Sequence, residues 1–204
     1  MADTAVLLPR APARPLTRSL LLAVVAAVTL LRLPSFFHQL YDPDEAAIAV
    51  QGMGLVRGGA LYTDVIDRKP PLAPWLYAES FRLTGNHDLR PLHVLAAIEL
   101  VAAAMVIAWE LRQRAGPSAA WWGAMLFVFG ALAFVPQNAQ AANFSHLALL
   151  PGAAAMVLAR RPGGRNAVLA GVLVGVATLT RQTWAIGVIP AAFAAWYHGD
   201  RHWI

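Results

Sequence analysis

The chain has 204 residues, of which 58% are hydrophobic and only 13% are charged, and its mean hydropathy is +0.54. Because about a quarter of the residues of a soluble domain are charged, this composition excludes an ordinary soluble protein and predicts a polytopic membrane protein. The absence of cysteine excludes disulfides and thiolate-ligated metals, and the net charge of +5 resides in arginines that flank apolar runs, which argues against nucleic-acid binding.

The N-terminal region predicts a cytoplasmic tail followed by a membrane anchor. Residues 1–18 mix arginines with prolines, which is typical of an unstructured tail. Residues 20–31 are uncharged and apolar, and a snorkelling Arg32 would let this span continue to Phe37. A cleaved signal peptide is the alternative, but no small-residue cleavage site follows, so we expect the anchor to be retained.

Four later apolar stretches predict further helices, at residues 92–109, 119–135, 143–159 and 167–197. The last is interrupted only at Arg181-Gln182. As one helix its 31 residues would extend about 46 Å, well beyond a hydrocarbon core of about 30 Å, so two spans meeting at Arg181 are expected. The predicted fold is therefore all-α, with about six transmembrane helices.

The distribution of arginines predicts how these spans are oriented. Basic residues at 112–114, 160–165 and 201 would lie on the same side as the N-terminal tail, and the positive-inside rule makes that side cytoplasmic. The expected organisation is a tail at 1–18, a transmembrane domain at 19–197 and a tail at 198–204. The polar interval 35–90 would form an extracytoplasmic loop of a multi-pass protein of the cell membrane.

An acidic group lies near the start of this predicted loop. Asp42 suits a helix N-cap, Pro43 suits the first helical position, and Glu45 would complete a capping box. The helix would run to about Arg57, end at Gly58-Gly59 and lie on the membrane surface. A catalytic role for the carboxylates is the alternative, and the residue types alone do not decide between the two.

A basic and proline-rich segment, Arg68-Lys69-Pro70-Pro71, lies further along the same loop. Lys69 is the only lysine of the chain, and two prolines stiffen the backbone behind it. Positive charge on the outer side is not a topology signal, and an anionic ligand such as a phosphate would explain it. Pairing with Asp64 or Asp67, or with lipid phosphates, is the alternative. A second amphipathic juxtamembrane helix is expected to begin at residue 72.

Together these motifs resemble the GT-C glycosyltransferases, and within them the protein-mannosyltransferase and aminoarabinose-transferase-like group. The shared features are an acidic pair after the first span, a surface helix, a turn containing Leu61-Tyr62-Thr63-Asp64, and Lys69-Pro70-Pro71-Leu72. Leu179-Thr180-Arg181-Gln182 resembles that group's basic-plus-Gln element after the fifth span. The resemblance covers nearly the whole chain and corresponds to the N-terminal half of such enzymes.

The resemblance implies transfer of a sugar from a polyprenyl-phosphate carrier to a lipid, glycan or protein acceptor outside the cytoplasmic membrane. Asp44 matches the catalytic acidic residue and would act as general base toward an acceptor hydroxyl. Glu45 would position the acceptor or the local backbone. Asp42 together with Asp44 is a candidate pair for a divalent metal ion, the one cofactor that the resemblance suggests.

The same resemblance assigns the basic residues to the donor. Lys69 matches the lysine expected to contact the carrier phosphate, because the departing phosphate anion requires positive charge. Arg68 would assist Lys69, and Arg181 would approach the same pocket from the fifth span. The candidates for further substrate contacts are Trp75, Tyr77 and Gln182, with anchoring at the membrane interface as the alternative for the two aromatic residues.

A non-catalytic membrane protein is the alternative to the enzyme. It would be a truncated, transporter-like or partner subunit that keeps the GT-C framework, and a second chain would then supply the family's C-terminal half. Transporters concentrate polar groups near the bilayer midplane. Here charged residues gather in the predicted outer loop instead, which favours chemistry on a lipid headgroup.

Overall fold

The computed structural model describes residues 16–38, 40–65, 67, 69–133 and 136–198. Within these residues the regular secondary structure is helical, and the only β-type pairing is an isolated bridge between Leu61 and Val65. The prediction of an all-α fold is therefore confirmed. The predicted tails fall largely outside the described residues, as does Arg68.

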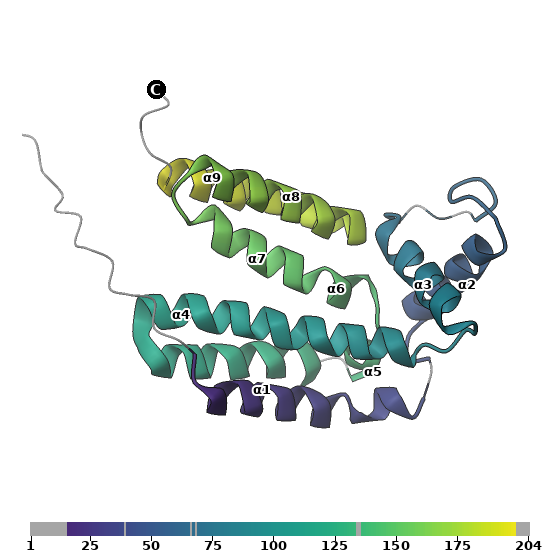
Figure 1. Cartoon of the computed structure of the whole chain (residues 1–204), viewed down its shortest axis with the longest axis horizontal. Helices are drawn as coiled ribbons and strands as arrows, with labels where there is room; N and C mark the ends of the chain where they lie inside the picture. The colour runs from purple at the N-terminus through teal and green to yellow at the C-terminus, as the bar shows by residue number, and fades with distance from the viewer. Residues whose placement is uncertain (1–15, 39, 66, 68, 134–135, 199–204) are drawn as a thin grey trace, which may run out of the picture.

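The helices follow one another closely along the chain (Figure 1). The first part contains α1 (Arg18–Leu31), the 3-10 helix η1 (Leu33–Phe36), α2 (Pro43–Val56), α3 (Leu72–Thr84) and α4 (Arg90–Ala133). The second part contains α5 (Pro136–Gln140), α6 (Phe144–Leu147), α7 (Leu149–Ala159), α8 (Gly164–Thr180), η2 (Gln182–Gly187) and α9 (Val188–His198).

The long helices form a bundle, and α2 and α3 pack against each other at one end of it (Figure 1). Within α4 the chain reverses at Gly116, whose φ of +87° lies in the left-handed region that favours glycine, and Pro117 follows. The reversal therefore follows directly after the basic residues 112–114. Arg112 and Arg114 are still helical, and Arg114 donates to the Glu110 carboxylate one turn earlier at 2.5 Å, a pair that adds stability to the helix.

Small and β-branched side chains dominate the main core, which lies between α1 and the two limbs of α4. Its fully buried members are Val24, Leu100, Ala104, Ala108, Ala120, Ala124 and Val128. Alanines allow helix backbones to approach closely, and in a membrane this close packing replaces the hydrophobic effect as the source of helix association. A second core joins α2 and α3 to the start of α4, and a third joins α7, α8 and α9.

Among the described residues, one helix is long and apolar enough to cross a membrane. This helix is α4, whose most apolar window has a mean hydropathy of 2.1. The ranges 18–31, 144–159, 164–180 and 182–194 are also apolar but shorter. The helix break at Arg181 is confirmed, since α8 ends at Thr180 and η2 begins at Gln182. The number of spans stays a prediction.

The turn that follows Arg181 is fixed by a close contact between Trp184 of η2 and Gly152 of α7. A Cβ atom at Gly152 would lie 2.2 Å from the Trp184 ring. Gly152→Ala is therefore expected to displace the indole and to lower the free energy of unfolding by about 1–3 kcal/mol. Unfolding in detergent would measure this loss.

Gly171→Ala is the matched control for that prediction. Gly171 lies on the exposed side of α8, and a Cβ added there meets no atom within 4 Å. Alanine is favoured over glycine in a helix by about 1 kcal/mol, so this variant should be at least as stable as the wild type. Equal stability of the two variants would contradict the packing role assigned to Gly152.

Candidate functional site

The acidic segment starts α2 as the sequence predicts. Asp42 is the N-cap, its Oδ1 accepts a 2.9 Å bond from the Glu45 amide, and Pro43 takes the first helical position. The helix ends at Val56, and Gly58 follows with a φ of +89°. The capping box differs from the expected one, because the Glu45 carboxylate accepts from the amide of Tyr41 at 3.0 Å.

Asp44 and Glu45 diverge because they are successive residues in the first turn of a helix. Asp44 is exposed, and its Oδ1 lies 2.5 Å from the Lys69 ammonium. This ammonium also lies 4.7 Å from the centroid of the Phe144 ring, a cation–π contact. The predicted lysine and the first carboxylate of the pair are thus in direct contact.

The loop before Lys69 is held by its own acidic residues. The Asp64 carboxylate accepts a 2.9 Å hydrogen bond from the backbone amide of Ala60. The Asp67 carboxylate accepts a 2.6 Å hydrogen bond from the side-chain amide of Gln51 and a 3.3 Å hydrogen bond from the backbone amide of Lys69. The alternative for the Lys69 ammonium was an ion pair with Asp64 or Asp67. In the structure these two carboxylates accept hydrogen bonds within and beside the loop, and the ammonium contacts Asp44.

Arg181 reaches the same region from the other end of the chain. It caps α8 in an extended conformation, and its guanidinium donates to the hydroxyl of Ser145. Ser145 directly follows Phe144, the residue beneath Lys69. We call Asp44, Lys69, Phe144, Ser145 and Arg181 the Asp44 cluster. The structure therefore brings together the acidic, lysine and arginine motifs that the sequence singled out, with exposed Gln182 next to Arg181.

The charges of the Asp44 cluster favour an anionic ligand. It contains one carboxylate and two cationic side chains, and the Asp44 and Lys69 side chains are 57% and 35% exposed. An ion pair this exposed contributes only about 0.2–1 kcal/mol to stability. Breaking it so that the Lys69 ammonium can bind a phosphate therefore costs little free energy. Arginine and lysine are the side chains that proteins use to bind phosphate groups.

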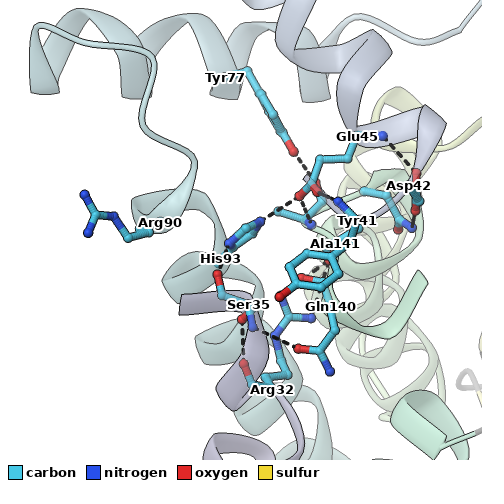
Figure 2. Close-up of polar contacts among 12 residues, drawn as sticks. Arg32, Ser35, Tyr41, Asp42, Glu45, Tyr77, Arg90, His93, Gln140 and Ala141 are labelled. Atoms are coloured by element: carbon cyan, nitrogen blue, oxygen red, sulfur yellow. Dashed lines mark hydrogen bonds and ion pairs between the residues drawn. The ribbon is translucent and has the colours of Figure 1, made fainter. Parts of the chain in front are cut away.

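Glu45 lies in a buried network behind the Asp44 cluster (Figure 2). Its Oε1 accepts from the Ala142 amide at 2.7 Å and lies 2.8 Å from Nε2 of His93. The other ring nitrogen, Nδ1, lies 2.6 Å from the carbonyl oxygen of Ser35. The His93 ring thus links the Glu45 side chain to the backbone of Ser35.

Arg32 is fully buried in the same network and does not snorkel, which corrects the sequence prediction (Figure 2). Its guanidinium donates to the carbonyl oxygens of Ala139 at 2.5 Å and Gln140 at 3.0 Å, at the open end of α5. In return, the Gln140 side chain donates to the carbonyl of Leu31 at 2.6 Å and accepts the Ser35 amide at 3.2 Å. We call Arg32, Ser35, Glu45, His93 and Gln140 the Arg32 network.

Two further bonds tie α2 and α3 to the start of α6. The side chain of Asn143 donates to Asp42 Oδ2 at 3.0 Å while capping α6 through the Ser145 amide. The Tyr77 hydroxyl donates to the carbonyl of Ala142 at 2.8 Å. Burial, reinforced by the nearby Glu45 carboxylate, raises the pKa of the Tyr77 phenol well above its ordinary value. Tyr77 is thus a packing residue, whereas Trp75 on the same helix is half exposed.

The two carboxylates suggested for a metal do not converge. Asp42 uses one oxygen as the helix cap and the other for Asn143, and Asp44 is directed toward Lys69. No group of three or more His, Asp or Glu side chains suited to a metal occurs in the part of the chain that the structure describes. These residues therefore do not form a preorganised metal site.

Sequence reasoning missed the role of the Arg32 network. His93 lies within the apolar stretch 92–109 and was not singled out, and Arg32 was expected to snorkel toward the membrane surface. A polar or charged residue inside an apolar span is costly unless it is paired within the protein. That rule, applied to both residues together, was the available signal for a buried network.

Comparison with known proteins identifies the family. A sequence model described as dolichyl-phosphate-mannose-protein mannosyltransferase matches residues 68–204, more than half of the chain. The match includes Lys69 and Arg181 and begins after Asp44. Neither the curated proteins nor the solved structures gave a match. The family agrees with the resemblance seen in the sequence motifs. The chain belongs to the dolichyl-phosphate-mannose-protein mannosyltransferase family, a family of GT-C-type membrane glycosyltransferases.

Proposed function

We propose that this chain moves a sugar from a polyprenyl-phosphate donor to an acceptor on the extracytoplasmic face, with the Asp44 cluster as its reaction site. The observation that carries the proposal is the 2.5 Å contact between Asp44 and Lys69, next to Arg181. Segments from three parts of the sequence converge there, and they supply one carboxylate and two cations. These are the groups that transfer from a phosphate leaving group requires.

The proposed reaction is an inverting displacement at the anomeric carbon. The acceptor hydroxyl forms a bond to this carbon while Asp44 takes the hydroxyl proton. The bond from the same carbon to the phosphate oxygen breaks, and polyprenyl phosphate leaves with the electron pair. Lys69 and Arg181 stabilise the negative charge that develops on the phosphate, so no proton donor is needed for the leaving group.

Donor binding would also activate the base. The Lys69 ammonium lies 2.5 Å from Asp44 Oδ1 and so occupies the carboxylate that the acceptor hydroxyl would need to reach. A donor phosphate would compete for this ammonium, and its attraction for the ammonium would grow as the bond to the sugar breaks, because the departing phosphate then gains a second negative charge. The carboxylate would then be released for the acceptor hydroxyl only when a donor is present.

Glu45 and the rest of the Arg32 network are proposed as positioning residues. Glu45 is fully buried and accepts hydrogen bonds from two backbone amides, so it is not available to a substrate. It holds the start of α2 against residue 142, two residues before Phe144. This contact would fix Asp44 relative to the residues beneath Lys69. Of the two roles that the resemblance allows for Glu45, positioning the acceptor or positioning the local backbone, we therefore propose the second.

The proposed orientation follows from the placement of the arginines. Arg114, Arg160 and Arg161 lie where α4 reverses and α7 ends, at the end of the bundle away from α2 and α3 (Figure 1). By the positive-inside rule that end is cytoplasmic, and the Asp44 cluster then faces outward. A multi-pass arrangement in the cell membrane is part of this proposal.

Lys69 offers a direct test of donor binding because it is the only lysine in the chain. Polyprenyl phosphate is expected to protect its amine from acetylation, with modification read by mass spectrometry and the N-terminal amine as internal control. Lys69→Ala is expected to lower kcat/KM by about 10- to 100-fold, mainly through KM for the donor, since one charge-assisted contact is lost.

Arg82→Ala is the control for that variant. Arg82 is an exposed cation of α3 that pairs with Glu79 and donates to the Leu55 carbonyl, at the end of α2 remote from Asp44, so its removal should leave kcat/KM unchanged. An unprotected Lys69, or an equal loss of kcat/KM in both variants, would contradict the assignment of Lys69 to the donor phosphate.

Transfer itself is tested with a panel of radiolabelled polyprenyl-phosphate sugars and membranes that contain the chain. Label appearing in an acceptor, dependent on Asp44, establishes the enzyme. Protection of Lys69 by the donor without any transfer would instead support the alternative of a binding subunit that requires a second chain. Absence of both would overturn the proposed function.

A further inference from the structure

A cavity of about 340 Å³ lies along α7, away from the Asp44 cluster. It is an open groove lined by both limbs of α4, by α7 and by η2. Its walls are mainly apolar, with Leu111, Phe127, Leu149, Met156 and Trp184 among the lining residues. The lining extends from Leu149, the first residue of α7, to Arg160, just past its last. The groove thus follows the full length of α7, about 16 Å.

The two ends of the groove differ. α7 begins beside α6, which carries Phe144 and Ser145, and runs to the end of the bundle where α4 reverses (Figure 1). Leu149 therefore marks the end toward the Asp44 cluster, and Arg160 marks the opposite end. A chain-like apolar molecule in this groove would have its polar group at one of these ends, and the charges decide which.

Positive charge is in surplus at the Arg160 end. Glu110, which is buried and also lines the cavity, is 2.5 Å from Arg114 and 2.6 Å from Arg161. Arg161 additionally stacks 4.3 Å from the Trp109 ring. Two arginines thus neutralise one carboxylate. Arg160 is exposed, lines the cavity, and has no side-chain hydrogen bond or ion pair to any described residue.

We propose that this groove binds an anionic phospholipid of the leaflet opposite the Asp44 cluster, with one acyl chain along α7 and the phosphate on Arg160. An apolar channel between membrane helices that ends at unneutralised arginine matches the chemistry of such a lipid. The donor fits this groove less well, because the phosphate that the proposed function assigns to Lys69 would lie at the other end. The proposed site is separate from the transfer reaction.

Native mass spectrometry of the detergent-solubilised full chain tests the proposal. The probe is an equimolar mixture of phosphatidylglycerol and phosphatidylcholine with the same acyl chains. The wild type is expected to retain phosphatidylglycerol preferentially. Arg160→Ala should lower the preference for phosphatidylglycerol over phosphatidylcholine by about tenfold, because one charge-assisted contact to the phosphate is lost. Ala153→Phe, which fills the groove and keeps the arginine, should lose bound lipid of both kinds.

Arg165→Ala is the matched control. Arg165 is exposed near the start of α8, carries the same charge as Arg160 and does not line the cavity, so its removal should leave the preference intact. The proposal is overturned if Arg165→Ala and Arg160→Ala lose the preference equally, or if a folded Ala153→Phe protein retains lipid normally. Displacement of phosphatidylglycerol by equimolar polyprenyl phosphate would also overturn it, since the groove would then belong to the donor's chain.

Discussion

Asp44→Asn is expected to lower kcat for sugar transfer by about 100- to 10,000-fold, the range typical of removing a general base. Asparagine keeps the size of the side chain and can still meet Lys69, so the start of α2 should be unchanged. What is lost is the ability to accept the acceptor's proton. KM for the donor should change little, because Lys69 and Arg181 remain. Initial rates with a radiolabelled donor measure both constants.

Glu79→Gln is the control for the loss of a carboxylate. Glu79 is exposed on α3 and pairs with Arg82, outside the Asp44 cluster. Its replacement should leave kcat unaltered. A wild-type kcat in Asp44→Asn would remove Asp44 from the reaction, and an equal loss in both variants would point to a general effect of surface charge.

Arg32→Met is expected to lower the free energy of unfolding by about 3–5 kcal/mol, the cost typical of deleting one partner in a buried charged network. Methionine has a similar length and fits the apolar surroundings, but it cannot donate to the carbonyls of Ala139 and Gln140. These carbonyls would be buried without their guanidinium partner, and buried unsatisfied acceptors are costly. Equilibrium unfolding in mixed micelles measures the difference.

Arg18→Met provides the comparison at the opposite end of α1, the helix that Arg32 caps. Arg18 is the first residue of α1 and is exposed, so its loss should change the free energy of unfolding by less than about 0.5 kcal/mol. If Arg32→Met were equally neutral, the guanidinium would not be holding the α5–α6 connection. The positioning of the Asp44 cluster by the Arg32 network would then lose its basis.

The features that the sequence predicted correctly are those determined by neighbouring residues. The bounds of α2 follow from Asp42 and Pro43 at its start and from Gly58 at its end, all within one helix length. The break at Arg181 follows from the length of the apolar run. Such signals act through local hydrogen bonds and backbone preferences, so no knowledge of the tertiary packing was needed to find them.

The features that the sequence did not predict depend on contacts between distant residues. Arg32 reaches the Ala139 carbonyl 107 residues away, and Glu45 reaches the Ala142 amide 97 residues away. Which charged residue is buried is therefore decided by packing between α1, α2 and the α5–α6 connection. The same reason explains Tyr77, which was expected to contact substrate or to anchor the chain at the membrane interface, and which is instead fully buried and bonded to the carbonyl of Ala142.

The predicted proximity of Lys69 and Arg181 had a different basis. Nothing in the spacing of these residues brings them together, and the expectation came from the resemblance to the GT-C family. The structure supplies the physical connection, since the two side chains contact the neighbouring residues Phe144 and Ser145. Whether this geometry transfers a sugar is the question that the kinetic experiments address.

A double-mutant cycle on kcat/KM for sugar transfer is the most direct test that Asp44 and Lys69 form one reaction site. It compares the wild type, Asp44→Asn, Lys69→Ala and the double variant with the same donor and acceptor. The two side chains are in direct contact, and contacting residues usually couple by about 0.5–3 kcal/mol, so the loss in the double variant should differ clearly from the product of the two single losses. Rate losses that multiply would show that the two residues act independently and would contradict the proposed site.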